Sequence, residues 1–255
     1  MSLAGGGQAR RRSPLTLFAL GSIAMLLIAT LMALGVWQLQ RRVWKLDLIS
    51  RIDQRIHAPA VDAPGPTTWP TIDAARDAYR HVRTEGEWLQ GRDTLVQAVT
   101  ALGGGFWVLT PMQTDAGFTL LVNRGFVPAE RADRSAATGR AVVSGLLRMS
   151  ELKGGFLRSN DPSAGRWFSR DVAAIAHARD LQGNAPYFLD ADRTLETGGP
   201  IGGMTVVEFP NSHLVYAFTW FALALMLLAG TAYVMREEWR AIRARSRLRN
   251  SDAGT

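Results

Sequence analysis

Two long runs without charge constrain this chain more than any other feature of its sequence. No residue between Arg12 and Arg41 is charged, and the same is true between Glu208 and Arg236. A helix of about 20 apolar residues is long enough to cross the hydrocarbon core of a bilayer. We therefore expect two transmembrane helices, one near each end of the chain.

The first run has an alternative interpretation as a cleaved signal peptide. The letters "ALG" at 33–35 offer small residues around a cleavage site. However, the apolar stretch from Leu15 to Val36 is longer than a typical signal sequence, and a second apolar run follows it. These features favour an uncleaved first helix over residues 14–40, with the second transmembrane helix over residues 209–235.

Positive charge gathers beside these runs. From Arg51 to Glu208 there are 17 Lys/Arg and 18 Asp/Glu, a difference of −1, whereas the whole chain carries +7. Basic clusters beside apolar runs indicate anionic lipid headgroups as partners, and a neutral middle without a basic stripe argues against nucleic acid. The chain has no cysteine, which excludes disulfides, thiolate metal sites and covalent haem attachment.

The basic tails predict the orientation in the membrane. Two spans place both termini on one side, and the arginines at 10–12 and in "REEWRAIRARSRLR" (236–249) predict that this side is the cytoplasm. Arg41, Arg42 and Lys45 argue in the opposite direction but are fewer. The expected arrangement is a cytoplasmic tail over 1–13, a periplasmic domain over 57–208 and a basic cytoplasmic tail over 236–255.

The periodicity of the middle region predicts its secondary structure. Trp44, Leu48 and Ile52 fall on one helical face, so the first helix should continue beyond the membrane to about residue 56, before the proline-rich linker "HAPAVDAPGPTTWP". Asp171 should cap a short helix over "DVAAIAHARDL". Short strands are predicted for "YRHVRTEGEW", "DTLVQAV", "GFWVLTPM", "GFTLLVNRGFVP", "AVVSGLLRMS", "GRWFSRD" and "MTVVEF".

Together these elements predict an α+β membrane protein. Two transmembrane helices flank a mainly antiparallel β domain, expected to be periplasmic, with one or two short helices. The glycines at 103–105 predict a hairpin or bulge, since no helix start follows them as a phosphate loop requires.

Catalytic chemistry has little support in the sequence. There is no GxSxG motif, and His57, His81 and His177 lack neighbours that would form a catalytic or zinc site, so each is expected at the surface or at a rim. We therefore expect a protein that is not an enzyme.

His213 is the strongest site candidate because it opens the second apolar run. Asn211 or Ser212 can cap the helix, which places His213 in its first turn, followed by Tyr216 and Trp220 at helical spacing. This stripe could hold a planar macrocycle, since a neutral imidazole binds metals. An aromatic belt at the membrane interface explains the same residues without a ligand.

Basic and aromatic residues at the outer end of the first run are the second part of the candidate site. Arg41 and Arg42 could pair with carboxylates of a ligand, or they could extend to lipid phosphates.

Four blocks, in this order, resemble the Surf1/Shy1 family of cytochrome c oxidase assembly factors. They are "GVWQLQRRVWKLDLI", "LLVNRGFVP", "SGLLRMSE" and "PNSHLVYAFTWFALA", and the resemblance extends from about Gly35 to Met235. In the first block Gly35, Trp37, Gln38, Arg41 and Lys45 match the family pattern; in the second Asn123, Arg124, Gly125 and Pro128 match it, while Phe126 replaces a tryptophan.

The resemblance implies a cofactor, partners and a location. His213 matches the candidate haem ligand, so haem a is the implied cofactor. For a haem bound there we expect Tyr216 and Trp220 against the ring and Arg41 or Arg42 near the propionates, with Trp37 as a further binding residue. The implied partner is the catalytic subunit of cytochrome c oxidase, with haem a synthase as a further candidate. Only 13 residues precede the first apolar run, which favours a bacterial plasma membrane over a mitochondrial one.

Two functions remain open from the sequence. The first is an assembly factor that binds haem a and assists its insertion into the catalytic subunit. The alternative is a membrane-anchored scaffold or chaperone that binds an oxidase subunit without touching haem. The "NRG" letters at 123–125 are interpreted structurally, as a strand end with a glycine at positive φ, and Arg124 either braces the domain or contacts a partner.

Overall fold

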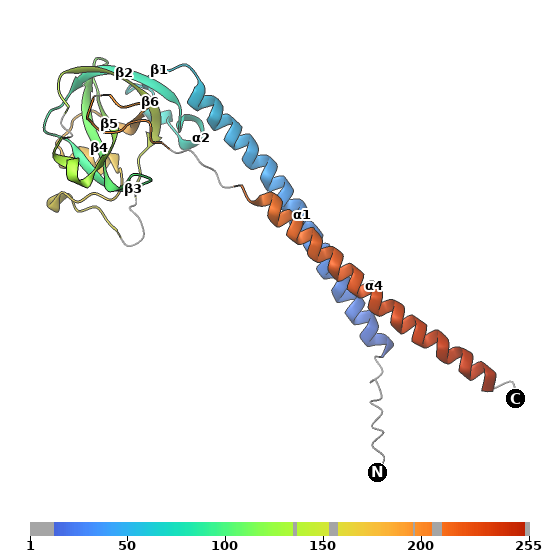
Figure 1. The fold of residues 1–255 in the computed structure, drawn as a ribbon. Helices are drawn as coiled ribbons and strands as arrows, with labels where there is room; N and C mark the ends of the chain where they lie inside the picture. Colours follow the sequence, from blue (N-terminus) through green and yellow to red (C-terminus); the bar gives the residue numbers. More distant parts are fainter. Residues whose placement is uncertain (1–12, 135–136, 153–157, 196, 206–210, 253–255) are drawn as a thin grey trace, which may run out of the picture. The chain divides into compact units, whose positions relative to one another are not determined.

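The structure is a computed structural model that describes residues 13–134, 137–152, 158–195, 197–205 and 211–252. The chain forms two compact units. The helical unit joins Met1–Leu48 to Phe209–Thr255, and the β domain comprises Ile49–Glu208 (Figure 1).

Two long helices form the helical unit. Helix α1 spans Pro14–His57, with its last residues in the β domain, and α4 spans His213–Asp252. Ser13 caps α1, since its Oγ accepts a hydrogen bond from the Thr16 amide at 3.1 Å, and proline occupies the first helical position. Both helices contain a segment long and apolar enough to cross a membrane, with mean hydropathy of 2.4 and 1.9, which fits a membrane-anchored protein.

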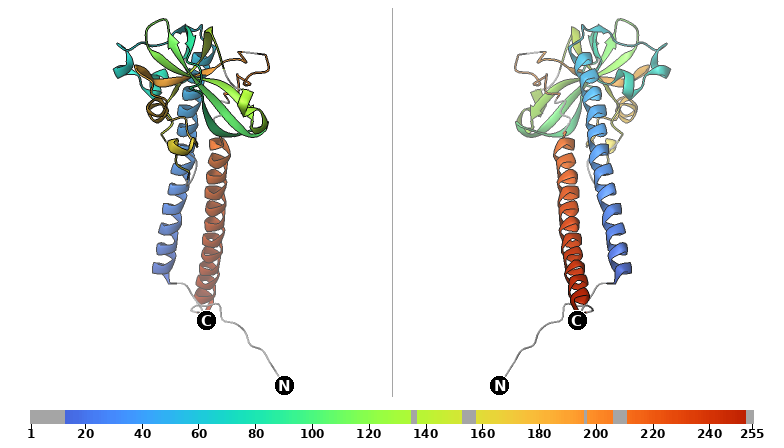
Figure 2. Two further views of the ribbon diagram at one scale, coloured as in Figure 1. Left: turned by 90° about the vertical axis from the view of Figure 1, so that its left-hand side faces the viewer. Right: turned by 90° about the vertical axis from the view of Figure 1, so that its right-hand side faces the viewer.

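The two helices run side by side in opposite directions (Figure 2). Near the start of α4 they approach closely, because a Cβ added to Gly35 would lie 2.4 Å from the Phe221 ring. Near the other end a groove of about 390 Å³ lies between them, lined by apolar side chains such as Leu20 and Leu227.

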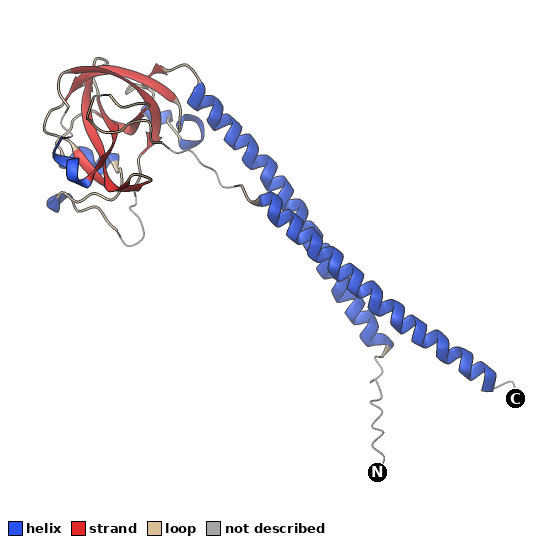
Figure 3. Cartoon of the chain, viewed as in Figure 1, coloured by secondary structure: helices blue, strands red, loops and turns tan. Residues whose placement is uncertain are grey.

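The β domain is built on seven strands. The order in the sheet is β1-β2-β6-β7-β5-β4-β3, and β2 also pairs with β4. This additional pairing closes β2, β6, β7, β5 and β4 into a ring, visible as the curled red ribbons of Figure 3. The strands are β1 Val61–Asp62, β2 His81–Trp88, β3 Thr94–Thr100, β4 Gly103–Thr114, β5 Thr119–Pro128, β6 Arg140–Met149 and β7 Asn184–Ala191.

The sheet is mixed in direction. The β1–β2 and β5–β7 pairings are parallel, and the other pairings are antiparallel. The short helices are η1 Trp69–Thr71, α2 Ala74–Asp77, η2 Ala129–Arg134, η3 Pro162–Ala164 and α3 Val172–Ala178. The predicted cap of α3 is confirmed, since the Asp171 carboxylate accepts from the Ala174 amide at 3.1 Å.

Two apolar clusters hold the β domain together. One fills the ring with side chains such as Val82, Leu120 and Leu147, and the other packs α3 against the outside of the sheet through Leu121 and Ile175. Alternate residues of β5 therefore enter different clusters, as the period of two in a strand requires. Nearly every residue of β5 is buried for this reason.

The strand predictions hold for five of the seven segments. Strands β2, β3, β4, β5 and β6 form where the alternation predicted them. The prediction for "GRWFSRD" was wrong, because this segment makes only isolated bridges, one of them between Trp167 and Val96. Most of "MTVVEF" (204–209) lies outside the described residues. Strand β7 was not predicted.

Within the β domain, His81 on β2 connects the segment after α1 with Asp192. The His81 ring contacts the Ala58 carbonyl through Nδ1 at 2.8 Å and the Asp192 carboxylate through Nε2 at 2.7 Å. Both partners are acceptors, so these contacts favour the imidazolium, in which both ring nitrogens donate. Partial burial lowers the pKa of His81, but the hydrogen bonds to Ala58 and Asp192 outweigh burial and raise it above 6.5.

We expect this pair to make the stability of the β domain depend on pH. Because the folded-state pKa of His81 is raised, its contribution is fully present below about pH 6.5 and is lost as the pH rises through the folded-state pKa. Urea unfolding of the full-length protein at a series of pH values measures this. The Asp192→Asn variant should reduce this pH dependence but not remove it, because the hydrogen bond to the Ala58 carbonyl remains, and an unchanged profile would contradict the role of Asp192.

Candidate functional site

His213 is the first residue of α4. The Ser212 carbonyl accepts the Tyr216 amide at 3.2 Å, so the helical hydrogen bonds begin at the residue before the histidine. The apolar sequence that follows continues the helix without a proline. The predicted placement of His213 in the first turn is confirmed.

The His213 ring faces α1 and forms a hydrogen bond with it. Its Nδ1 lies 2.8 Å from the Gln38 Oε1, and both side chains are half-buried. An amide oxygen only accepts, so Nδ1 carries the donated proton. In a neutral ring the other nitrogen, Nε2, then keeps its lone pair. A hydrogen bond at one nitrogen that leaves the other free to coordinate is the usual setting of a histidine that binds a metal.

Small residues set the distance between the two helices at this site. Ala217 and Ala224 lie four and eleven residues after His213, on the same helical face, and both are buried. On α1, Gly35 lies one turn before Gln38 and contacts the Phe221 ring. Because small residues let helix backbones approach closely, this packing fixes the rotation of both helices. It thereby holds Gln38 opposite His213.

The aromatic candidates lie beside this contact. Tyr216 is 53% exposed and Trp220 is half-buried on α4, and Trp37 is 53% exposed on α1. Exposed aromatic surface around a half-buried imidazole is compatible with either a membrane-interface belt or a flat ligand.

The structure separates the two arginines that the sequence grouped together. The Arg41 guanidinium stacks over the Trp44 ring at 4.0 Å from its centroid, and the side chain is exposed. Arg42 follows Gln38 by four residues, so it lies on the same helical face one turn further, and it is half-buried. Arg42 is therefore the more buried of the two arginines that lie one turn beyond Gln38.

Gln38 is the site residue that sequence reasoning missed. It was recognised as part of the block "GVWQLQ", but its amide was given no role beside His213. Its position in the sequence could have indicated this role. Gln38 lies three residues after Gly35, on the same helical face, and a glycine on a helix face allows another helix to approach closely.

The other histidines have separate surroundings. His57 and His177 are exposed, as predicted, and His81 pairs with Asp192. Within the part of the chain that the structure describes, no group of three or more histidine, aspartate or glutamate residues could hold a metal ion. A metal bound at His213 would therefore need a ligand that brings most of its own donors, as a haem does.

A second polar centre lies in the β domain. The Asp190 carboxylate is only 3% exposed, and it accepts hydrogen bonds from Asn123, Arg148, Arg170 and Thr205 at 2.7–3.2 Å. Sequence reasoning did not find it, because β7, which carries Asp190, was not predicted. Every charge in it is paired, so it is a bracing network of the domain.

Of the "NRG" letters, Asn123 belongs to this centre, whereas the Arg124 side chain lies near Thr110 and Trp88. The Asn123 amide binds Asp190, and the Arg124 side chain is buried, so it braces the domain. Gly125 has a φ of +128°, as predicted. The predicted strand end was wrong, because β5 continues to Pro128 and the pairing with β4 shifts instead, which makes a bulge at this point.

Comparison with known proteins identifies the family. A sequence model of the SURF1 family matches residues 25–225, most of the chain. The chain belongs to the SURF1 family. It is 32% identical to surfeit locus protein 1 of Homo sapiens over 235 residues, covering 83% of this chain and 75% of that protein.

Other relatives are similarly distant. Surfeit locus protein 1 of Xenopus tropicalis is 32% identical, covering 83% of this chain and 73% of that protein. The SURF1-like protein of Caenorhabditis elegans is 28% identical, covering 88% and 76%. The SURF1 family is known for cytochrome c oxidase assembly factors and is not known for enzymes. The matched region includes Gln38 and His213.

Proposed function

We propose that this SURF1-family protein holds haem a at His213 and assists its insertion into the catalytic subunit of cytochrome c oxidase. The observation that carries the proposal is the hydrogen bond from the His213 Nδ1 to the Gln38 Oε1. It joins two apolar helices and leaves Nε2 able to coordinate. Family membership supplies the connection to oxidase assembly.

The side chains present fit a haem. When bound, haem a would supply an iron that an imidazole nitrogen can ligate. His213 offers Nε2 for this purpose, and Gln38 orients the ring. Tyr216 and Trp220 offer apolar surface on the same helix.

Arg42 is the better candidate for the haem propionates. It lies on the Gln38 face, and a guanidinium binds a carboxylate through two parallel hydrogen bonds. The Arg41 guanidinium is engaged with Trp44. We therefore assign the propionate role to Arg42 and give Arg41 and Trp37 a place at the membrane interface.

We propose a bacterial plasma membrane as the location. The basic tails favour termini in the cytoplasm, which puts the β domain in the periplasm. Anionic lipids are then partners of the tails, and haem a synthase is a candidate donor of the haem.

The visible absorption spectrum tests the proposal. We expect full-length protein purified from cells that make haem a to carry haem absorbance and the His213→Ala variant to lack it. Removing an outer-shell partner of a metal ligand weakens affinity by about 10–100-fold, so Gln38→Ala should retain much less haem. His177→Ala is the matched control, since His177 is exposed on α3 and should leave the spectrum unchanged.

The scaffold alternative predicts a different result. If the protein binds an oxidase subunit without haem, the His213→Ala variant should support oxidase assembly as well as the wild type does. Haem content of the oxidase isolated from cells carrying each variant separates the two functions. Normal haem a content with His213→Ala would overturn the haem proposal.

A further inference from the structure

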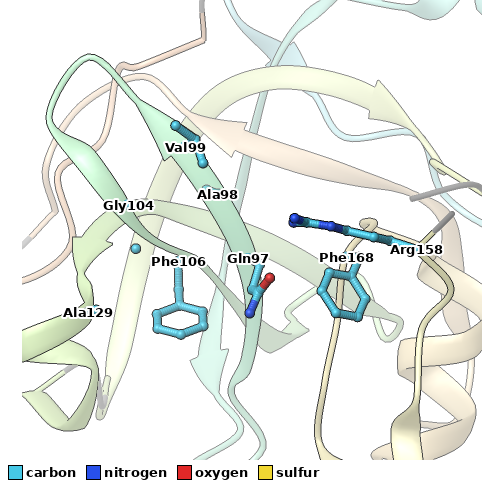
Figure 4. A pocket seen from close by; sticks show the side chains of 9 residues that line it. Gln97, Ala98, Val99, Gly104, Phe106, Ala129, Arg158 and Phe168 are labelled. Atoms are coloured by element: carbon cyan, nitrogen blue, oxygen red, sulfur yellow. The ribbon is translucent and has the colours of Figure 1, made fainter. Parts of the chain in front are cut away.

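A wide pocket lies on the β3–β4 hairpin. Its volume is about 650 Å³, and Figure 4 shows its lining side chains. Gln97 on β3 and Phe106 on β4 face each other across the hairpin and point to the same side. Arg158 extends from the opposite wall toward β3, and Phe168 lies beside it.

Among the residues that the structure describes, the edge of β3 along this pocket is open. The Gln97 amide donates to the Trp167 carbonyl at 2.8 Å, so the Gln97 N–H points away from β4. Residues two apart in a strand direct their backbone groups to the same side, which turns Val99 outward as well. Among the described residues no strand pairs with β3 on this side beyond the Val96–Trp167 bridge. The Val99 side chain is 88% exposed.

The charge of the pocket is set by one residue. Arg158 is the only charged side chain in the lining, and within the described parts of the chain no carboxylate lies within ion-pair distance of it. Its guanidinium lies 5.7 Å from the centroid of the Phe168 ring. The other arginines near this side of the sheet are paired, Arg166 with Asp161 and Arg170 with Glu151.

We propose that this edge binds an extended segment of a partner polypeptide that carries an aspartate or glutamate side chain. The segment continues the β-bridge that Trp167 begins, with its backbone hydrogen-bonded to Val99. Adding a strand to an exposed sheet edge supplies affinity through the main chain, and side-chain pockets supply specificity. Here Arg158 selects a carboxylate, and Phe106 and Phe168 offer apolar contacts beside it.

Binding of two synthetic peptides to the full-length protein in detergent micelles tests this proposal. Both probes are capped peptides of alternating valine and threonine, one with a central aspartate and one with a central lysine. We expect the aspartate peptide to bind the wild type at least about tenfold more tightly, because a charge-assisted hydrogen bond selects it. Titration calorimetry measures both dissociation constants.

Variants separate the two parts of the interaction. Arg158→Glu should reverse the preference, so that the lysine peptide binds more tightly. Arg193→Glu is the control: Arg193 is exposed and does not line this pocket, so this variant should keep the wild-type preference. Val99→Pro removes the outward N–H and should abolish binding, and Val99→Thr keeps it and should bind as wild type.

Three results would overturn the proposal. They are no binding of either peptide at millimolar concentration, equal affinity of the wild type for both peptides, and unchanged binding by Val99→Pro. None of these outcomes depends on haem, so they leave the function proposed for His213 untouched.

Discussion

Replacing Asp190 with asparagine is expected to destabilise the β domain by about 3 kcal/mol or more. The buried carboxylate is shared by Arg148 at 2.9 Å and Arg170 at 3.2 Å. Burial lowers the pKa of Arg170, but Asp190 and Glu151 outweigh it and raise the pKa above its ordinary value, so the guanidinium stays charged. Removing one partner of a buried ion pair costs about 3–5 kcal/mol. Glu151 still pairs with both arginines, so we expect a loss at the lower end of this range.

The measurement is urea unfolding of full-length protein in micelles, followed by near-ultraviolet circular dichroism. Asparagine has nearly the same shape as aspartate, so the decrease in the free energy of unfolding reflects the lost charge and not a change in side-chain volume. Asp115→Asn is the matched control. Asp115 pairs with Arg140 at 2.6 Å on the surface, where an ion pair contributes at most about 1 kcal/mol. Equal unfolding midpoints for Asp190→Asn and wild type would contradict the bracing role.

Replacing Gly125 with alanine is the second change with a large expected effect. Its φ of +128° is a conformation that residues with a side chain rarely adopt. A Cβ there would lie 2.2 Å from the Ile201 carbonyl oxygen, which is backbone and cannot swing aside. Phe126 and Ile201 exchange two backbone hydrogen bonds at 2.8–2.9 Å next to this point, so the strain falls on that bridge. We expect a loss of about 3 kcal/mol or more.

Gly91→Ala separates the two sources of this loss. Gly91 has a φ of +69°, but an added Cβ would meet nothing within 4 Å. It should therefore cost only the backbone preference, about 1–2 kcal/mol. If Gly125→Ala costs no more than Gly91→Ala in the same urea measurement, the contact with Ile201 is not tight in solution.

Local sequence patterns predicted the elements that depend on local physics. The helices α1 and α4 follow from uninterrupted apolar runs, and α3 follows from the Asp171 cap. The hairpin at the glycines 103–105 also formed, with β4 beginning at Gly103. Each of these depends on interactions within a few residues of sequence.

Strand β7 could not be predicted in the same way. Pro186 interrupts its pattern, and proline in a run normally argues against a central strand. Tertiary contacts override this, because β7 lies between β6 and β5 and is buried by both apolar clusters. The ring closure by β2 and β4 likewise pairs residues that no local pattern relates, such as Gly86 with Thr114.

The candidate site was predictable in part. His213 was found because an ionisable residue at the start of an apolar run is conspicuous. Gln38 was not assigned to it, since its role depends on which faces of two helices meet. That is set by Gly35 and Phe221, which lie 186 residues apart in the numbering, and by the buried Ala217.

The place of β7 in the ring has a consequence for biogenesis. Among the described residues β7 is the last strand, yet it lies between β6 and β5, so the ring cannot close until Ala191 has left the ribosome. Only residues 192–212 then precede α4. If the β domain is exported as it is synthesised, most of it stays unfolded on the far side of the membrane until β7 has been made. During this time its strand edges are unpaired and can pair with other chains. Holding chaperones in that compartment would therefore act on this protein before its second helix enters the lipid.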